Sequence, residues 1–570
     1  TCDGLYIQHV TPENGITLDS QGKDVFSGIN GNCEFQKSIY LGNNESLIYW
    51  QDRRFSPLQN LTYGMKFSDV NSLSENQDGV SLSDNAYQSN ATIVSAGNNL
   101  FMGFDQTDGD INQFYDILDY DLNSILGQSA GVDPNDSYSQ AYYHIVFNEL
   151  ENLIYYIYSD NRDGAYNIYV QQFNISGNLT WTSSVKIAET IGSGVFQSDD
   201  NVIGALPNDN GGCIVLYNSG YFLEKNIYAI AIDSDGQIQE GWDSEGLKLS
   251  NNNDDQYIES FTHTPYGILV TFKDDRSGSN DIYAQLISYS GELLFDAEGL
   301  NIVNAENDQE SSAVSYSEIA DEALICWDDY RTGSGYDLYC KYINFGMTGN
   351  DLSYTLSEEI ELSGPSNTSG GNQQGSFIYP SQSGSFLITW EDYRNDIDGD
   401  IYFQEISGYN FRLTNGGERV CDMEWPQLSP KIDLYSESNG SYVIYWKDLR
   451  STGKEYLFNI YAQSYTTDWI DLDNDLVQIP NQFGIQKAYP NPFNPSLSID
   501  FSIQQISDIE LIVYNLYGQQ VEVLYEGSMG VGSHSIKWSP ESQISSGMYF
   551  VRLKNKSTNL IDSKKIIFIK

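Results

Sequence analysis

The sequence predicts an all-β fold, an eight-bladed β-propeller followed by a small immunoglobulin-like β-sandwich. Three observations lead to this prediction: a long internal repeat, an alternating strand pattern inside each repeat, and an abrupt change of composition near residue 487. An aromatic residue closes an apolar run at positions 50, 104, 158, 217, 272, 327, 390 and 446, in steps of 54, 54, 59, 55, 55, 63 and 56 residues. A period near fifty residues indicates stacked supersecondary units.

A short motif follows the aromatic residue in most copies. The best copies read Trp-x-Asp-x-Arg and begin at Trp327, Trp390 and Trp446. Worn copies begin at Trp50, Tyr158 and Phe272, and the copies at Phe104 and Tyr217 keep only the aromatic residue. Strand alternation places the three motif residues on one side of the strand. There the Asp can accept hydrogen bonds from turn amides, and the Arg can pair with the Asp. We interpret the set as a structural clasp. The alternative is a ligand pocket repeated on one rim, but chemistry normally needs one constellation rather than six similar copies.

The unit around Phe272 shows what one repeat contains. We expect four antiparallel strands, at Tyr257–Thr262, Gly267–Phe272, Asp281–Ile287 and Glu292–Phe295, joined by turns rich in Asp, Gly and Ser. Eight such units indicate a propeller, and an open solenoid is the alternative. Closure is favoured because Asp3–Gln8 resembles the late half of a repeat and can complete the last blade. Seven blades is the alternative count if one worn copy is misassigned.

The domain boundaries follow from composition. Residues 1–467 form the predicted propeller, 468–486 a linker, and 487–570 the second domain. Three prolines fall within six residues at Pro490–Pro495, which forces an extended, turn-rich entry. About 85 residues with six or seven short strands predict a β-sandwich of immunoglobulin-like type. We expect its strands at Leu497–Ile503, Ile509–Tyr514, Gln520–Tyr525, His534–Trp538, Met548–Leu553 and Ile566–Ile569.

Several ordered motifs in the second domain carry a resemblance. They are Tyr-Pro-Asn-Pro-Phe-Asn-Pro at 489–495, Val-Tyr-Asn-Leu-Tyr-Gly-Gln at 513–519, Ser-Gly-Met-Tyr-Phe-Val-Arg-Leu at 546–553 and Ser-Lys-Lys at 563–565. Residues 487–570 therefore resemble the type A C-terminal sorting domain of the type IX secretion system of Bacteroidota. The resemblance implies recognition by that machinery, passage through the outer membrane, and a secreted or cell-surface location, often with removal of the domain. The Trp-x-Asp-x-Arg repeats resemble those of large exported bacterial propeller proteins, which implies the fold only.

The charge is strongly and unevenly acidic. The chain has 28 Lys and Arg against 79 Asp and Glu, a net charge of −51, while residues 481–570 are nearly neutral. Such a surface repels phosphate backbones and anionic lipid, so we expect neither nucleic-acid nor membrane-surface partners. No stretch approaches the roughly 18 apolar residues of a membrane span. Nothing near Thr1 resembles a signal peptide, and we expect an export signal to have been removed.

Six cysteines occur without any Cys-x-x-Cys pair, which argues against zinc-ribbon and thioredoxin-type readings. Cys326 and Cys340 flank one hairpin symmetrically about Gly333, where a cross-strand disulfide can form. Cys2, Cys33 and Cys421 fall near the ends of the repeat array, where a staple would help closure. Cys213 lies in an apolar run and is most simply a buried thiol.

Catalytic motifs are missing from the sequence. The four histidines are scattered, and no zinc-binding, nucleophile-elbow, phosphate-loop or dinucleotide motif occurs. The sequence therefore favours a binding or adhesion protein, with a glycan, a surface polymer or another protein as ligand. The alternatives are an extracellular glycosidase or lyase with its site in the central funnel, and a structural component of a surface layer.

Two acidic loops have the spacing of weak calcium sites, the one cofactor that the sequence suggests. Oxygen ligands alternate or nearly alternate at Asp396, Asp398 and Asp400, and at Asp105, Asp108 and Asp110. Asp-Gly is also ordinary hairpin chemistry, so a simple turn is the competing interpretation at both loops.

Overall fold

The computed structural model divides the chain into two compact units, Thr1–Asp468 and Trp469–Lys570. Within them the structure describes residues 5–7, 9–11, 15–16, 23–26, 33–42, 45–52, 60–67, 79–83, 88–108, 110–133, 138–189, 201–221, 224–348, 351–362, 371–395, 397–408, 410–413, 416–421, 426–436, 441–448, 459–466, 484–503, 507–516, 519–529, 532–540, 544–556 and 560–570. The predicted linker, 468–486, falls largely outside these residues.

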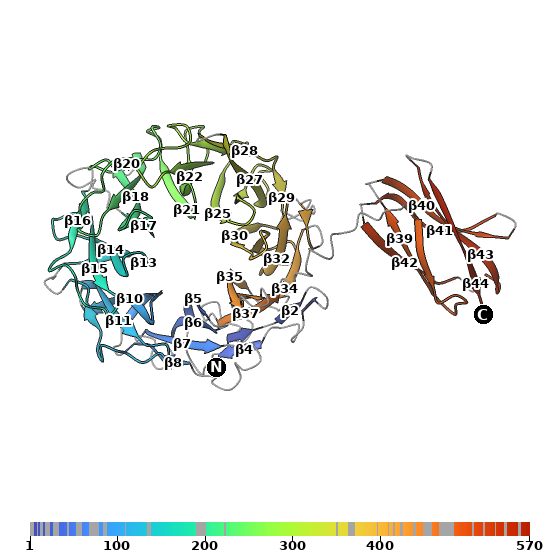
Figure 1. Ribbon diagram of the computed structural model, residues 1–570, viewed down its shortest axis with the longest axis horizontal. Helices are drawn as coiled ribbons and strands as arrows, with labels where there is room; N and C mark the ends of the chain where they lie inside the picture. The colour runs from blue at the N-terminus through green and yellow to red at the C-terminus, as the bar shows by residue number, and fades with distance from the viewer. Residues whose placement is uncertain are drawn as a thin grey trace. The chain divides into compact units, whose positions relative to one another are not determined.

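The described part of the first unit contains eight sheets, which Figure 1 shows arranged in a ring. We number them 1 to 8 along the chain. The first four consist of β5 (Cys33–Gly42), β6 (Glu45–Asp52), β7 (Leu61–Phe67) and β8 (Val80–Ser81); β9 (Gln88–Ala96), β10 (Asn99–Asp108), β11 (Asp110–Leu118) and β12 (Ala130–Gly131); β13 (Gln140–Asn148), β14 (Leu153–Asp160), β15 (Asn167–Asn174) and β16 (Val185–Ala188); and β17 (Asn201–Pro207), β18 (Cys213–Tyr221), β19 (Glu224–Ile232) and β20 (Leu247–Lys248).

Sheets 5 to 8 continue the same pattern with small additions. They consist of β21 (Gln256–Thr264), β22 (Gly267–Asp274), β23 (Asp281–Ile287) and β24 (Leu300–Val303); β25 (Gln309–Ser317), β26 (Glu322–Asp329), β27 (Asp337–Thr348), β28 (Asp351–Leu356) and β29 (Ile360–Glu361); β30 (Gln373–Pro380), β31 (Phe386–Asp392), β32 (Asp400–Ser407), β33 (Asn410–Phe411) and β34 (Glu418–Cys421); and β35 (Gln427–Ser436), β36 (Ser441–Asp448) and β37 (Asn459–Thr466) with β1 (Leu5–Ile7), β2 (His9–Thr11), β3 (Gly15–Ile16) and β4 (Lys23–Phe26). The all-β prediction is confirmed, and the arrangement is consistent with a β-propeller.

The N-terminal strand closes the ring, as expected. β1 pairs in parallel with β37, with Tyr6 opposite Tyr461, and β4 pairs antiparallel with β1. Sheet 8 therefore contains both ends of the repeat array. Side chains also join sheets 8 and 1, because the Ser38 hydroxyl on β5 donates to Asp433 on β35 at 2.5 Å.

Each sheet buries its apolar side chains against the next sheet. Trp327 on β26 is fully buried in a cluster that includes Leu269 and Ile282 of sheet 5. In the same way, Trp390 on β31 packs with Leu324 of sheet 6. Because second strands such as β22 are covered on both faces, they read as continuous apolar runs in the sequence. The repeated aromatic residue thus fills the gap between neighbouring sheets.

A repeated glycine sits against that aromatic ring just before the last strand of four sheets. Its backbone has positive φ, a region that favours glycine. A Cβ at these positions would lie 2.7 Å from Trp50 at Gly79, 2.1 Å from Tyr217 at Gly246, 2.7 Å from Phe272 at Gly299 and 2.3 Å from Trp390 at Gly417. The glycine therefore lets the outer strand approach the buried ring.

The predicted last strand of sheet 5 is wrong in position. Residues 292–295 do not form the fourth strand; Leu293 makes one isolated bridge to Ile287, because the turn closes with the Ser288 amide donating to the Glu292 carbonyl at 2.9 Å. The fourth strand is Leu300–Val303, which pairs with β23. Local apolar content thus pointed to Glu292–Phe295, whereas the register with β23 selects the later segment.

The predicted hairpin disulfide is present in sheet 6. Cys326 on β26 and Cys340 on β27 lie directly opposite one another and are joined through sulfur. Cys213 is a buried free thiol. Cys421 is buried on β34. The predicted staple near the array ends remains a prediction, since Cys2 lies outside the described residues, as does the Cys33 side chain.

The second unit is a two-sheet β-sandwich. One sheet contains β38 (Gly484–Tyr489), β39 (Leu497–Ile503) and β42 (Gly532–Trp538), and the other contains β41 (Gln520–Met529), β40 (Ser507–Asn515), β43 (Gly547–Asn555) and β44 (Ile561–Phe568). Alternate residues meet between the sheets, where Phe501, Val513, Trp538 and Val551 are almost fully buried. The sandwich prediction is therefore confirmed.

Candidate functional site

The repeated motif forms a clasp inside sheets 3, 5, 6 and 7. In sheet 6 the Asp329 carboxylate accepts bonds from the Arg331 amide at 2.9 Å, from Arg331 Nη2 at 2.6 Å and from Trp327 Nε1 at 2.9 Å. The Arg331 guanidinium also lies 4.2 Å from the ring centroid of Tyr339 on the next strand. The guanidinium group of arginine can pair with a carboxylate and stack on an aromatic ring at the same time, because it is planar and its charge is delocalised. The same Asp–Arg–Tyr set occurs at 160, 162 and 169, at 274, 276 and 283, and at 392, 394 and 402.

A repeated glutamine completes the clasp. It opens the first strand of sheets 2, 3 and 5 to 8, and its side chain is almost fully buried in each. Gln256 donates to Asp274 at 2.8 Å, and Gln140 donates to Asp160 at 3.1 Å. These carboxylates therefore bond within their own sheets. The geometry is that of the structural clasp rather than of a repeated ligand pocket.

The first strand of each sheet carries a bulge, and the preceding sheet often caps it. The Glu391 carboxylate of sheet 7 accepts the Ser429 amide of sheet 8 at 2.7 Å, and Asp328 of sheet 6 accepts the Gly375 amide of sheet 7 at 3.0 Å. Both capped residues have positive φ. A bulge leaves a backbone group without a ladder partner. The side-chain cap satisfies it and ties neighbouring sheets together.

One position on the first strands differs from sheet to sheet. These strands lie nearest the centre of the ring in Figure 1. The position is the one paired with the residue just before the repeated aromatic, and it is occupied in sheets 1 to 8 by Lys37, Thr92, His144, Gly204, Ser260, Ala313, Phe377 and Lys431. We call this set the axial ring. Its basic members fall on sheets 8, 1 and 3, and small or apolar residues occupy sheets 4 to 7.

The two axial lysines lack acidic partners. Lys37 Nζ donates to Thr92 Oγ1 at 2.7 Å, and Lys431 Nζ lies 4.4 Å from the ring centroid of Phe377. Neither lysine forms an ion pair with a carboxylate of the described residues. Burial lowers the pKa of Lys37 to about 8, against the opposing influence of Asp105. Burial, and then the nearby Lys447, lower the pKa of Lys431.

His144 and its strand neighbours complete this side of the ring. Burial, and then the positive charge of Lys37, lower the pKa of His144 to about 4, so its imidazole is neutral at pH 7. Tyr142 occupies the bulge of β13 at φ 45°, and the residue is 58% exposed. Next to it, the Tyr143 hydroxyl donates to the Gly103 carbonyl at 2.7 Å and to the Asn90 carbonyl. Lys37 on β5 therefore lies close enough to His144 on β13 for its charge to act there, whereas Lys431 on β35 lies against Phe377 of sheet 7.

Asp105 is the first of the predicted calcium ligands that the structure describes. It is 8% exposed on β10 and accepts bonds of 2.6 Å each from Asn90 Nδ2 and Gln113 Nε2. Burial raises its pKa, while these amide donors act in the opposite direction. Asp108 and Asp110 lie opposite one another where β10 meets β11, but their side chains fall outside the described residues.

The second predicted loop is also only partly described. Asp396 lies outside the described residues, Asp398 is half-buried, and Asp400 is 1% exposed with Oδ2 3.4 Å from Arg419 Nη1. Among the described side chains, no group of three His, Cys, Asp or Glu has a metal-holding arrangement. Calcium binding at the two loops stays a prediction.

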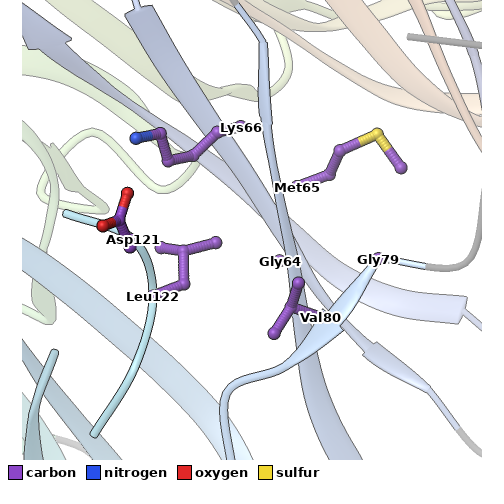
Figure 2. A pocket seen from close by; sticks show the side chains of 7 residues that line it. All are labelled: Gly64, Met65, Lys66, Gly79, Val80, Asp121 and Leu122. Carbon is purple, nitrogen blue, oxygen red and sulfur yellow. The ribbon is translucent and has the colours of Figure 1, made fainter. Parts of the chain in front are cut away.

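A small pocket lies away from the ring centre, between sheet 1 and the turn after β11. Figure 2 shows its walls, which are Gly64, Met65, Lys66, Gly79, Val80, Asp121 and Leu122. Its volume is about 190 Å³, below the roughly 300 Å³ at which small-molecule sites begin. Lys66 already donates to the Tyr120 carbonyl at 2.6 Å and pairs with Glu45 at 3.2 Å. The axial ring is therefore the stronger candidate site.

Our sequence analysis missed the axial residues, although the repeat contains a signal for them. In sheets 2, 3 and 5 to 8 the axial residue lies four positions after the buried glutamine that opens the first strand. Aligning the repeats on that glutamine places His144 and Lys431 beside Thr92 and Ala313. A basic residue in one repeat, where other repeats have small residues, would have singled out the position.

The second unit indicates the cellular location of the chain. Residues 487–570 match the family model of the secretion system C-terminal sorting domain. The chain carries a type IX sorting domain. It is therefore exported to the cell surface or the extracellular space, and the sorting domain implies contact with the secretion machinery. The model of the family covers this domain and not the ring of sheets. No described helix is long and apolar enough to cross a membrane.

Solved structures resemble the chain only distantly. A prolyl endopeptidase is 9% identical with a TM-score of 0.40, over 76% of this chain and 59% of that one. PorZ, a surface component of the type IX secretion system of Porphyromonas gingivalis, is 11% identical with a TM-score of 0.27, over 94% and 81%. A polysaccharide lyase is 10% identical with a TM-score of 0.36, over 65% and 88%. The chain spans 59% of the endopeptidase, less than two thirds of its length. No curated protein matches the sequence. Nothing about ligand or activity follows from these likenesses.

Proposed function

We propose that this chain is an exported binding protein, an eight-bladed β-propeller that holds a glycan, surface polymer or protein ligand at the axial ring. In this proposal the eight sheets are the eight blades, and the immunoglobulin-like sandwich of the sorting domain delivers the propeller to the cell surface or medium. The observation that carries the proposal is the contrast between the two side-chain sets. The repeated Asp and Arg residues bond to one another inside sheets 3, 5, 6 and 7, whereas Lys37, His144 and Lys431 break the repeat.

A binding site needs groups that are held in place and are still reachable. The clasps and bulge caps fix the first strands, so the side chains of the axial ring start from a rigid frame. Lys37, His144 and Lys431 are half-buried rather than sealed. Sites of this kind suit recognition because few rotamers are lost on binding.

The test of this proposal is a binding screen with the exported chain. The protein is applied to a glycan array and, immobilised, to outer-membrane and medium fractions of the producing bacterium. We expect saturable binding that the double variant Lys37→Met/Lys431→Met weakens by at least about tenfold, equal to about 1.4 kcal/mol. Binding to none of these samples, or equal binding by the double variant, would contradict the proposal.

A second candidate is a glycosidase or lyase, and one arrangement favours it. Asp105, with a raised pKa, lies close enough to Lys37 for each charge to influence the other, and Tyr143 influences the same group of residues. Burial raises the pKa of Asp105 and lowers the pKa of Lys37, and neighbouring groups with perturbed pKa values are typical of acid–base catalysis. Turnover of polysaccharides that Asp105→Asn abolishes, while binding persists, would establish this candidate. If the polysaccharides bind but none is turned over, the result supports binding without catalysis.

A further inference from the structure

The β-sandwich of the second unit has one outward side that is apolar where such sides are normally polar. In an antiparallel sandwich, residues alternate between the core and the solvent, and the solvent side is polar. The three-stranded sheet follows this rule, because its outward positions include Ser498 on β39 and the exposed Lys537 on β42, which lie directly opposite one another. The four-stranded sheet departs from the rule by exposing apolar side chains.

The exposed apolar residues of the four-stranded sheet form one continuous patch. Phe550 and Met548 on β43 are 37% and 36% exposed, and Val523 on β41 is 40% exposed. Between them, on β40, Ile512 lies opposite Val523 and Tyr514 lies opposite Phe550. Contiguous exposed apolar surface of this kind marks an interaction site. We call the patch and the arginine within it the outer face, which consists of Ile512, Tyr514, Val523, Met548, Phe550 and Arg552.

The arginine of the outer face is held in place by a tyrosine. Arg552 lies opposite Ile512, its guanidinium lies 4.3 Å from the ring centroid of Tyr514, and its Nη2 donates to the Tyr514 hydroxyl. This stacking orders the planar group in advance, so less side-chain entropy is lost on binding. Aromatic residues, methionine and arginine are the residue types enriched at the centres of protein interfaces. The composition therefore favours a protein partner.

Basic side chains surround the apolar patch. Lys554 and Lys565 lie at outward positions of β43 and β44. Two acids on the same side, Glu510 and Glu526, both pair with Lys556, at 3.2 Å and 2.6 Å. With the guanidinium inside the patch, four cations stand against two acids among the described side chains of this side. The described part of this surface is therefore net positive.

The charge of the first unit sets the sign of the partner's charge. Residues 481–570 hold eight Lys and Arg against seven Asp and Glu, so the net charge of −51 for the chain leaves −52 for residues 1–480. A basic partner surface would attract all of that acid and could not distinguish the sorting domain from it. An acidic surface repels the first unit and attracts the basic side of the sandwich. Selective recognition of the sorting domain therefore requires an acidic partner.

We propose that the outer face is the surface by which the sorting domain docks on the secretion machinery, and that the partner is an acidic protein surface with an apolar centre. Met548 and Phe550 pack into the apolar centre, and Arg552 pairs with a carboxylate beside it. The lysines around the patch add attraction at longer range. The proposal does not depend on which ligand the axial ring binds.

The experiment measures export of the full chain by the producing bacterium. Quantitative immunoblots compare the chain in the medium and on the cell surface with the chain retained inside the outer membrane. We expect Phe550→Ser and Arg552→Glu each to lower the exported fraction by about fivefold or more, as loss of a central interface contact does. The double variant Lys554→Glu/Lys565→Glu should lower it as well, because it reverses charge and leaves the apolar patch intact.

Matched controls separate docking from folding. Ile397→Ser removes an exposed apolar side chain from the first unit, and Lys537→Glu reverses an exposed charge on the three-stranded sheet of the sandwich. Neither should change the exported fraction. Phe550→Tyr keeps an aromatic ring and should be exported like the wild type. Differential scanning calorimetry of each purified full-length variant shows whether it folds, and if Arg552→Glu unfolds the sandwich, the double lysine variant decides the charge prediction.

A photo-crosslinking phenylalanine analogue at position 550 identifies what covers the outer face. We expect crosslinks in exporting cells to a segment of a secretion-machinery protein that is rich in Asp and Glu, and we expect Arg552→Glu to abolish them. Crosslinks to a basic segment, or to a second copy of this chain, overturn the inference. Unchanged export of folded Phe550→Ser and of the folded double lysine variant overturns it as well. Ligand binding by the ring of sheets should be the same in all these variants.

Discussion

The carboxylate of Glu391 on β31 accepts the backbone amide of Ser429 on β35 at 2.7 Å, and it also accepts the Tyr393 hydroxyl at 3.0 Å. One sheet thereby caps the bulge of the next. The contact shows how the ring holds its first strands in register at the point where their ladders are interrupted.

Replacing Glu391 by Ala should destabilise the ring of sheets. The Ser429 amide then loses its acceptor at a bulge, at a cost of about 1–3 kcal/mol. Urea unfolding followed by tryptophan fluorescence measures the change. Glu391→Gln keeps an acceptor oxygen and should lose less, and Glu292→Ala, at an exposed turn, should change little. If Glu391→Ala unfolds like wild type, the cap contributes nothing to stability.

The clasp should show strong coupling between its two charges. A double-mutant cycle with Asp329→Asn and Arg331→Met removes a charge-assisted contact in which the carboxylate is fully buried. We expect a coupling free energy of about 1–3 kcal/mol from denaturation. The matched surface pair, Lys186 and Glu189 at 2.5 Å, should give at most about 0.5 kcal/mol. Equal coupling for both pairs would rule out a structural role peculiar to the clasp.

His144 should make the fold sensitive to acid. Its pKa falls from 6.5 to about 4 in the folded chain, so the unfolded chain binds more protons between these pH values. Stability from this residue is therefore present above about pH 6.5 and is lost as the pH falls toward 4, by up to about 3 kcal/mol.

The measurement is the unfolding free energy of wild type and of His144→Gln at pH 7.5 and at pH 4.5. The variant lacks the titrating group, so it should lose less stability on acidification than wild type. Carboxyl groups with raised pKa values, such as Asp433, titrate in both proteins and cancel in the comparison. Identical losses would show that burial does not shift the titration of His144.

Calcium should raise the thermal midpoint if the acidic loops bind it. Removing the metal with a chelator and adding it back, followed by differential scanning calorimetry, measures the shift. Asp398→Asn should reduce the shift, because a neutral amide is a weaker ligand than a carboxylate. Magnesium serves as the matched control ion. If neither calcium nor the chelator changes the thermal midpoint, the Asp-Gly segments are turns that do not bind calcium.

Much of the fold could be predicted because its signals are local and repeated. The aromatic residue, the Asp and the Arg recur within five residues, and apolar runs mark β22 and β26 directly. The fourth strands were harder. Leu300–Val303 is short and is selected by pairing with β23, a tertiary requirement, so the nearby apolar Glu292–Phe295 was a plausible but wrong choice.

The candidate site was predicted poorly for a related reason. A search for motifs finds repeated or familiar spacings. The calcium prediction came from such spacings in Asp396–Asp400 and Asp105–Asp110. Lys37 and Lys431 are almost 400 residues apart and share no local motif. Their equivalence depends on the register of two different sheets and on the closure of the ring.

The sequence alone predicts the strand-rich repeats, the acidic surface and the sorting domain, because each follows from composition or from short contiguous motifs. Ring closure through β1, the saturation of each clasp carboxylate and the meeting of Lys37 with the group around His144 come from folding in three dimensions. The physical reason is the separation along the chain over which each interaction acts. Alternation and turn chemistry act over a few residues, whereas burial and electrostatics act between strands that the chain itself places far apart.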